Sequence, residues 1–224
     1  MTRQSPPSVR TLCLTGGIAC GKTLVASFWA RLGIPVIEAD AVCHDLVRPG
    51  RPAHAAIVRA FGRNVLAPDG QVDRPALGRL VFADPARLAA LNAILHPPAR
   101  RAIAAWVAKG GPAGAPGVVA PGAGSTPPLQ PGGFRIVAAV VPLVYEAGWE
   151  SDWDRVVCVA APPTLQRRRL AARGLASTEI RRRLAAQWPV PDKARRADAV
   201  IFNAGVPALA EEQARRIVER IRET

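Results

Sequence analysis

The stretch Gly16-Gly17-Ile18-Ala19-Cys20-Gly21-Lys22-Thr23 decides the fold, because it has the spacing of a phosphate-binding loop: glycine, four residues, then Gly-Lys-Thr. The apolar run Thr11–Leu14 precedes it, and the helix-forming run Leu24–Arg31 follows it. Glycines let successive backbone N–H groups point at one anion, and the start of a helix adds its positive end. This strand–loop–helix context favours a nucleoside triphosphate site over a glycine-rich turn without a ligand.

Each part of this loop has its own predicted task. The backbone from Gly17 to Leu24 is expected to surround the phosphates, and it comprises Gly17, Ile18, Ala19, Cys20, Gly21, Lys22, Thr23 and Leu24. Lys22 is expected to reach the β- and γ-phosphates, and the Thr23 hydroxyl to bind Mg²⁺. The loop alone predicts a bound triphosphate and leaves the reaction open.

The length and composition bound the class of protein. The 224 residues suffice for one α/β domain with insertions or for two small units, and 49% of them are apolar. No apolar run reaches about 18 residues, and Met1–Arg10 lacks the apolar core of a signal peptide, so we expect a cytoplasmic protein without a membrane partner. The four cysteines have no metal-ligand spacing, and Cys13 and Cys158 are expected to be buried thiols.

The net charge of +13 has three possible explanations. The charge could bind nucleic acid, the arginines could bind phosphorylated small molecules, or an arginine-rich composition could reflect genomic base bias. Aromatic residues make up only 5% of the chain and are not interleaved with the basic ones, which argues against binding to single strands. We therefore expect no specific nucleic-acid partner. We also expect the protein to be a monomer or a weak homo-oligomer.

Five short apolar segments have the character of buried parallel strands. They are Arg10–Leu14, Ile34–Ile37, Arg135–Val141, Asp154–Ala160 and Ala199–Phe202. The first two flank the phosphate loop and its helix, which ends at Gly33. The predicted fold class is therefore α/β, with a five-stranded parallel sheet.

Residues Ala41–Ala108 are predicted to be mostly helical. The expected helices are Ala53–Phe61, a helix capped by Asp73 that runs through Val81, Ala86–Leu95, and a last helix that ends near Lys109. Pro97-Pro98 is expected to separate the last two. Gly110–Gly133 is rich in glycine, proline, alanine and serine, which predicts a flexible, disordered and dispensable insertion.

Two arginine-rich helices, Thr164–Arg173 and Ser177–Gln187, are predicted after the fourth strand, and Pro207–Arg222 is the expected closing helix. Arg169 and Arg173 share one helix face, so they suggest a lid that brings positive charge to a transferring phosphate. The alternative is a solvated basic face. That alternative is favoured for four other arginines, namely Arg167, Arg168, Arg181 and Arg182.

Two carboxylates end the second predicted strand, at the edge where open α/β sheets bind ligands. Asp40 is placed to accept the proton of an attacking alcohol, although an Asp before a helix can also act as its N-cap. Glu38 is interpreted equally well as a partner of that site or as a charge at the strand end. Asp40 therefore predicts phosphoryl transfer to a hydroxyl group.

An ordered series of motifs resembles the dephospho-CoA kinase family, from about Leu12 to the closing helix and excluding Gly110–Gly133. Besides the loop, the matching segments are Val36–Asp40 with His44, Phe61-Gly62, Gly70–Arg74, Val81-Phe82, Leu91–Pro97, Pro142–Glu146, Gln166, Arg169, Arg173, Arg183, Gln187, Ala197–Ile201 and Asn203. One such match would be weak, whereas the ordered series is highly specific.

The resemblance implies ATP-dependent phosphorylation of the ribose 3′-hydroxyl of dephospho-coenzyme A, with ATP and Mg²⁺ required. By position it implies catalytic roles for Lys22, Asp40 and Arg173. It also implies acceptor binding by Asp40, His96, Arg100 and Arg169, and an approach of Asn203 to the adenine. An alternative role for His96, to which we give equal weight, is to cap the carbonyls at a helix C-terminus.

The resemblance implies a P-loop kinase fold with three layers, a helical acceptor domain and a lid. The expected parts are a nucleotide-binding core (10–40, 134–165 and 197–224), an acceptor region (41–109), the insertion (110–133) and the lid (166–196). Another small-molecule kinase and a nucleotide-dependent switch without phosphoryl transfer are the competing interpretations.

Several residues depart from the family pattern. Ala19 stands where the family usually has Gly, Cys20 where it has Ser, and Glu38 where it has Asp. The third strand ends without an Asp, so Mg²⁺ is expected to depend on Thr23, the phosphates and water. Cys20 lies near Lys22 among inward-pointing amides, which predicts a lowered thiol pKa and a reactive thiol.

Overall fold

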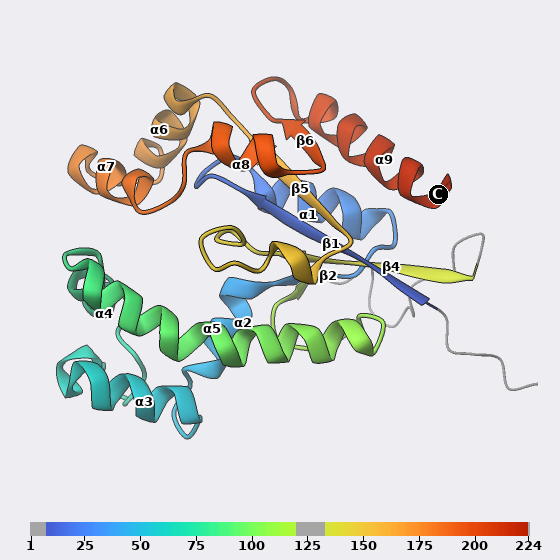
Figure 1. Ribbon diagram of the computed structural model, residues 1–224. Coiled ribbons are helices and arrows are strands. Elements are labelled where there is room, and N and C mark those ends of the chain that lie inside the picture. Colours follow the sequence, from blue (N-terminus) through green and yellow to red (C-terminus); the bar gives the residue numbers. More distant parts are fainter. Residues whose placement is uncertain (1–7, 120–132, 224) are drawn as a thin grey trace, which may run out of the picture. The chain divides into compact units, whose positions relative to one another are not determined.

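The computed structural model describes residues 8–119 and 133–223 (Figure 1). The chain divides into two compact units, one formed by Met1–Glu38 with Trp106–Thr224 and the other by Ala39–Ala105. Across the described ranges, no helix combines the length and hydropathy needed to cross a bilayer.

A six-stranded sheet forms the centre of the first unit, in the order β3-β2-β4-β1-β5-β6. Five strands run parallel, whereas β3 pairs antiparallel to β2 at the edge. The strands are β1 (Ser8–Gly16), β2 (Val36–Glu38), β3 (Val118–Val119), β4 (Phe134–Val140), β5 (Arg155–Ala160) and β6 (Ala199–Phe202). The five parallel strands predicted from the apolar runs are confirmed.

The short strand β3 corrects the prediction for the insertion Gly110–Gly133. Val118 and Val119 pair with Ile37 and Val36, and the Glu38 amide donates to the Gly117 carbonyl at 2.9 Å. These bonds satisfy backbone groups of β2 that would otherwise lie at an open edge. Residues 120–132 of the predicted insertion lie outside the described residues.

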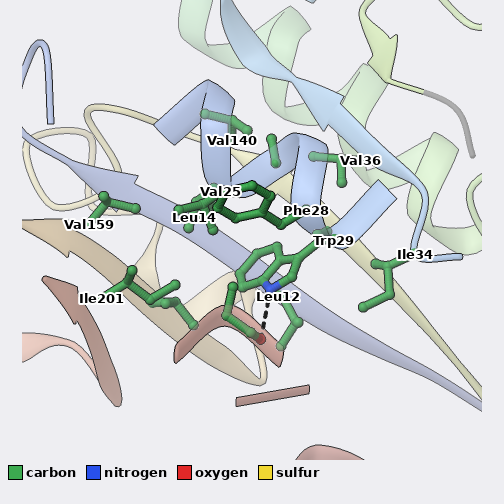
Figure 2. Close-up of a cluster of buried hydrophobic side chains, with 14 of the residues drawn as sticks. Leu12, Leu14, Val25, Phe28, Trp29, Ile34, Val36, Val140, Val159 and Ile201 are labelled. Carbon is green, nitrogen blue, oxygen red and sulfur yellow. Dashed lines mark hydrogen bonds between the residues drawn. The ribbon is translucent and has the colours of Figure 1, made fainter. Parts of the chain in front are cut away.

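Helices α1 (Lys22–Arg31) and α9 (Pro207–Glu223) share a hydrophobic core with the sheet. Val25, Phe28 and Trp29 recur at helical spacing on α1 and are buried against strand residues such as Leu12 and Leu14 (Figure 2). The Trp29 indole also donates to the Ala214 carbonyl of α9 at 3.2 Å. This core places the phosphate loop at the end of β1.

Three helices lie between β5 and β6 in the sequence: α6 (Pro163–Ala171), α7 (Ser177–Ala185) and α8 (Val190–Arg196). Two of them were predicted, whereas α8 was not. In the segment 188–191, tryptophan and valine alternate with two prolines. The apolar residues there do not have the spacing of a helix, so the start of α8 could not be predicted from the pattern. Pro191 lies in the first turn of α8, where its missing N–H has no intrahelical partner to lose.

The second unit is helical. It contains α2 (Ala39–Leu46), α3 (Pro52–Phe61), α4 (Arg74–Phe82) and the first part of α5 (Pro85–Ala108), with a 3₁₀ turn at Arg63–Val65. Its core includes Ile57, Val65, Leu77 and Val81. The predicted cap is confirmed, because the Asp73 carboxylate accepts the Ala76 amide at 3.0 Å.

The continuity of α5 contradicts the predicted break at Pro97-Pro98. The helix passes through both prolines, although each lacks the N–H for an i−4 hydrogen bond. On one side of them, Leu91 and Leu95 pack against the core of the second unit; on the other side, Ala99 and Ile103 are buried. Packing of apolar side chains on both sides of the prolines offsets the two missing hydrogen bonds.

Candidate functional site

The phosphate loop joins β1 to α1, and two of its glycines are required by close contacts. Gly16 has a φ of 136°, and a Cβ there would collide with the Val159 carbonyl. Gly21 has a φ of 102°, and a Cβ there would collide with the Asn203 amide. Both positions combine a left-handed backbone with a neighbour that leaves no room for a side chain.

Lys22 and Thr23 begin α1 at the end of the loop. The Lys22 ammonium donates to the Gly16 carbonyl at 3.0 Å and to the Gly17 carbonyl at 2.9 Å, so the side chain curls back over the loop. Thr23 is exposed in the first helical turn. A hydroxyl at this place is a hard oxygen ligand of the kind that Mg²⁺ prefers.

Ala19 adopts a φ of 60°, and among the described residues it is the one non-glycine with a positive φ. The family's usual glycine would adopt this conformation without strain. The Ala19 methyl instead packs with Leu170 of α6 and Ile180 of α7. Compared with glycine, Ala19 therefore strains the backbone of the loop but adds an apolar contact with the predicted lid.

The prediction for Cys20 was wrong. Its side chain is fully buried, and burial raises the pKa of the thiol, outweighing the opposite effect of Lys22. Cys13 and Cys158 are also fully buried, as predicted, and burial raises the pKa of both. A buried thiol with a raised pKa is a core residue and not a nucleophile.

Arg169 and Asn203 brace the loop from the other side. The Arg169 guanidinium donates to the carbonyls of Ala19 at 3.0 Å and Cys20 at 3.3 Å, and to the Asn203 carbonyl at 3.1 Å. The Asn203 side chain is buried and donates to the Cys20 carbonyl at 2.8 Å. Within the first unit, the structure thus brings these two predicted site residues onto the backbone of the loop.

The segment between α7 and α8 also contacts the loop. The Gln187 side-chain oxygen accepts the Ile18 amide at 3.0 Å. A cavity of about 590 Å³ lies beside this contact. Its mostly apolar walls include Gly17, Ile18, Pro162, Gln187, Val190 and Phe202.

Sequence reasoning missed a buried ion pair near the same segment. Lys193 of α8 is fully buried, and its ammonium donates to Glu146 at 2.7 Å and to the Pro142 carbonyl at 2.7 Å. Two signals were available: Lys193 is one of only three lysines in an arginine-rich chain, and both of its partners lie in the motif segment Pro142–Glu146.

Arg173 lies just beyond the end of α6 and is exposed. Arg167 and Arg168 are exposed as well, in agreement with a solvated basic face at those two positions. The structure therefore separates the arginines of α6 into one that holds the phosphate loop and others that face solvent.

The remaining predicted site residues belong to the second unit. Asp40 is exposed in the first turn of α2, two residues beyond the end of β2. His96 lies in the middle of α5, and burial lowers the pKa of its imidazole. The alternative role of His96 as a C-terminal helix cap was wrong, because α5 continues to Ala108. Arg100 follows one turn later and is exposed.

Thr23 is the residue of the loop that could bind a Mg²⁺ ion. Among the described residues, no group of three His, Cys, Asp or Glu side chains has the geometry to hold a metal ion. The exposed Thr23 hydroxyl can supply one ligand, and phosphate oxygens and water can supply the others.

Residues 10–111 and 131–220 match the family model described as dephospho-CoA kinase. The chain belongs to the dephospho-CoA kinase family. It is 42% identical to a dephospho-CoA kinase of Anaeromyxobacter dehalogenans over 96% of this chain and 93% of the relative. It is 43% identical to one from Symbiobacterium thermophilum, over 88% and 75% of the two chains. As a member of this family, the chain is a kinase that uses ATP to phosphorylate dephospho-CoA, in the last step of coenzyme A synthesis.

Solved structures agree with the predicted fold. The crystal structure of TT1252 from Thermus thermophilus has a TM-score of 0.73 and 32% identity, and the match covers 97% of this chain and 98% of that one. A dephospho-CoA kinase from Campylobacter jejuni, at 22% identity and a TM-score of 0.62, supports the fold. The α/β P-loop kinase fold expected from the resemblance is confirmed.

Proposed function

We propose that the chain phosphorylates the ribose 3′-hydroxyl of dephospho-coenzyme A, with the phosphate loop holding ATP and Asp40 accepting the proton of that hydroxyl. The observation that carries this proposal is the braced loop: glycines at two crowded positions, Lys22 folded over the loop, and Arg169 and Asn203 bonded to its carbonyls. Such a loop presents its amides to phosphate in a fixed arrangement.

Asp40 suits the role of base because it is exposed and follows β2 by two residues. In the proposed step the hydroxyl proton passes to the Asp40 carboxylate while the hydroxyl oxygen attacks the γ-phosphorus. The bond from that phosphorus to the β-phosphate oxygen breaks, and coenzyme A and ADP are formed. Bound Mg²⁺ would neutralise phosphate charge, with Thr23 as its protein ligand.

The other predicted residues complete the proposal. Lys22 would contact the β- and γ-phosphates, and Arg173 would supply charge to the transferring phosphoryl group. His96 and Arg100 would contact the acceptor, and residues 41–109 would form the acceptor region. Asn203 approaches the adenine in this proposal, although its side-chain amide already holds the Cys20 carbonyl. Arg169 likewise holds loop carbonyls and would act on substrate through the loop.

A cytoplasmic location and a monomer or weak homo-oligomer are also part of this proposal. The free thiols of Cys13, Cys20, Cys43 and Cys158 support a reducing compartment.

The deciding experiment measures coenzyme A formed from Mg-ATP and dephospho-coenzyme A. Replacing Asp40 by Asn keeps the shape and removes the base, so kcat should fall by about 10² or more while ATP affinity stays within about two-fold. Asp69→Asn is the matched control in the same unit, because Asn can keep the turn contact to the Gln71 amide. Normal turnover in Asp40→Asn would remove Asp40 from the role of base.

A second variant tests the predicted lid arginine. Arg173→Ala should lower kcat by about ten-fold or more, whereas the exposed Arg168→Ala should leave kcat unchanged. Equal kcat values for both variants would assign Arg173 to the solvated basic face.

A further inference from the structure

We propose that Lys193 and Glu146 are positioning residues for ATP, and that they act by holding Gln187 against the phosphate loop. This inference rests on the proposed function and adds two residues to the ATP-binding half of the site. All of its contacts lie within the first unit.

The first observation is the burial of Lys193. Its side chain is fully buried, and its ammonium contacts the Glu146 carboxylate and the Pro142 carbonyl, both at 2.7 Å. A buried ion pair is a weak source of stability, since well-packed apolar residues can often replace it. Its two charges are therefore better explained by a positional role than by packing.

Composition supports the same conclusion. The chain contains 30 basic residues, and only Lys22, Lys109 and Lys193 among them are lysines. Lys22 belongs to the phosphate loop, and Lys109 is exposed. A compact ammonium suits this place between a carbonyl and a carboxylate, so the use of lysine in an arginine-rich chain agrees with a specific contact at position 193.

The contacts lead from this ion pair to the loop. The Glu146 oxygen that binds Lys193 also accepts the Trp188 amide at 2.8 Å. Trp188 follows Gln187, whose side-chain oxygen accepts the Ile18 amide at 3.0 Å. The ion pair therefore fixes the backbone next to Gln187, and Gln187 fixes one amide of the phosphate loop.

A second contact ties the same cluster to the start of the loop. The Pro142 carbonyl that binds Lys193 also accepts the Thr15 hydroxyl at 3.2 Å. Thr15 is fully buried and precedes Gly16 directly. Lys193 thus lies at the centre of contacts that reach the loop at both Thr15 and Ile18.

The test compares Lys193→Met with Arg216→Met, which removes a positive charge at an exposed position of α9 in the same unit. Lys193→Met should weaken ATP binding by about ten-fold or more, measured by calorimetric titration and by the KM for ATP. Because the predicted acceptor region lies in the other unit, the KM for dephospho-CoA should stay within about two-fold. Arg216→Met should change neither value.

A double-mutant cycle with Gln187→Ala tests the route. If the ion pair acts through Gln187, then Gln187→Ala alone weakens ATP binding, and adding Lys193→Met weakens it by less than about two-fold further. If the fold-losses in ATP affinity of the two single variants multiplied in the double variant, the proposal would be overturned. A lower melting temperature with both KM values unchanged would also overturn it, because that result describes a purely structural ion pair.

Gln187→Ala keeps the proposal testable if Lys193→Met does not fold, since Gln187 is only half-buried. Unchanged ATP affinity in that variant would contradict the proposal. Failure of the proposed function is a separate result. In that case the parent chain itself would form no coenzyme A from Mg-ATP and dephospho-CoA.

Discussion

Ala19 is the residue where the phosphate loop departs furthest from ordinary backbone geometry. Its left-handed conformation costs a non-glycine residue about 1–2 kcal/mol. Its buried methyl returns about 0.8 kcal/mol through contact with Leu170 and Ile180. The methyl contact offsets roughly half of the backbone cost, which helps to explain how alanine can occupy a position where the family usually has glycine.

We therefore expect Ala19→Gly to change the free energy of unfolding by less than about 1 kcal/mol, measured by urea denaturation. Ala19→Val should lower it by about 2 kcal/mol or more, since a branched side chain is more strained at this φ. A valine variant as stable as the parent would contradict the backbone geometry of the loop.

At the scale of the element, α5 shows how burial overrides a local helix-breaking signal. Pro97 cannot donate to the Ala93 carbonyl, yet the helix continues because apolar side chains pack on both sides of it, partly buried before it and buried after it. The helix forms in spite of the missing hydrogen bond at Pro97, and a substitution can restore that bond.

Pro97→Ala restores an N–H at an exposed position and should stabilise the chain by about 1–2 kcal/mol after the greater freedom of the unfolded chain is subtracted. The melting temperature should rise by about 2–4 °C per kcal/mol, measured by circular dichroism. Pro98→Ala, at a half-buried position, serves for comparison. A lower melting temperature in Pro97→Ala would show that proline contributes to packing there.

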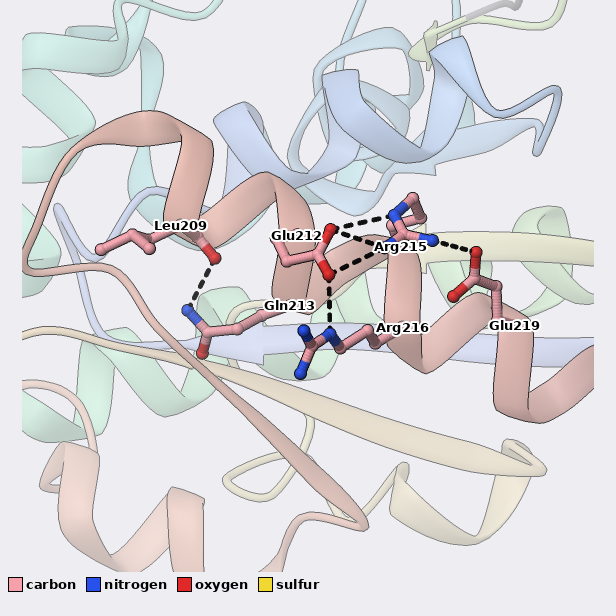
Figure 3. A network of polar contacts seen from close by, with 6 residues as sticks. All are labelled: Leu209, Glu212, Gln213, Arg215, Arg216 and Glu219. Carbon is pink, nitrogen blue, oxygen red and sulfur yellow. Dashed lines mark hydrogen bonds and ion pairs between the residues drawn. The ribbon is translucent and has the colours of Figure 1, made fainter.

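Helix α9 shows the contacts that some of the chain's many arginines make. Glu212 accepts hydrogen bonds from Arg215 and Arg216 at 2.7 Å, and Arg215 also pairs with Glu219 (Figure 3). These bonds lower the pKa of Glu212. The arginines on this face of α9 are therefore paired with carboxylates one turn away.

Glu212→Gln should lower the melting temperature slightly at pH 7. Because the folded-state pKa of Glu212 is lowered, its contribution is complete above the ordinary glutamate pKa and is lost as the pH falls below that value. The difference between parent and variant should therefore shrink in melts taken at falling pH, and also at high salt. A difference that grew on acidification would contradict this sign.

For the whole molecule, Trp29 joins segments from opposite ends of the chain. It is fully buried on α1, and its indole donates to the Ala214 carbonyl of α9 (Figure 2). Trp29→Phe removes that second donor to a carbonyl which keeps its place in the hydrogen bonds of α9, and it leaves a small cavity. We expect a loss of about 1–3 kcal/mol in the free energy of unfolding.

Urea denaturation followed by circular dichroism measures this loss. Leu209→Ala is the control, since Leu209 is a large apolar residue of α9 that is 59% exposed. Its substitution should cost less than about 1 kcal/mol. Equal losses in the two variants would show that the shared core does not couple α1 to α9.

Local signals in the sequence determined much of this protein. The loop spacing, the five apolar runs and the Asp73 cap each depend on a few adjacent residues, so they could be predicted without knowledge of contacts. The ordered family motifs added the reaction. Asp40, His96, Arg100 and Arg173 remain predictions as site residues.

Other features were decided only by the tertiary structure. Burial raised the pKa of Cys20, kept α5 continuous through two prolines, and enclosed the Lys193–Glu146 ion pair. Pairing across the sheet made a strand of Val118–Val119. Each of these outcomes depends on neighbours far away in the sequence, and the free energy of burial and pairing that they supply exceeds the local preference of the residues involved.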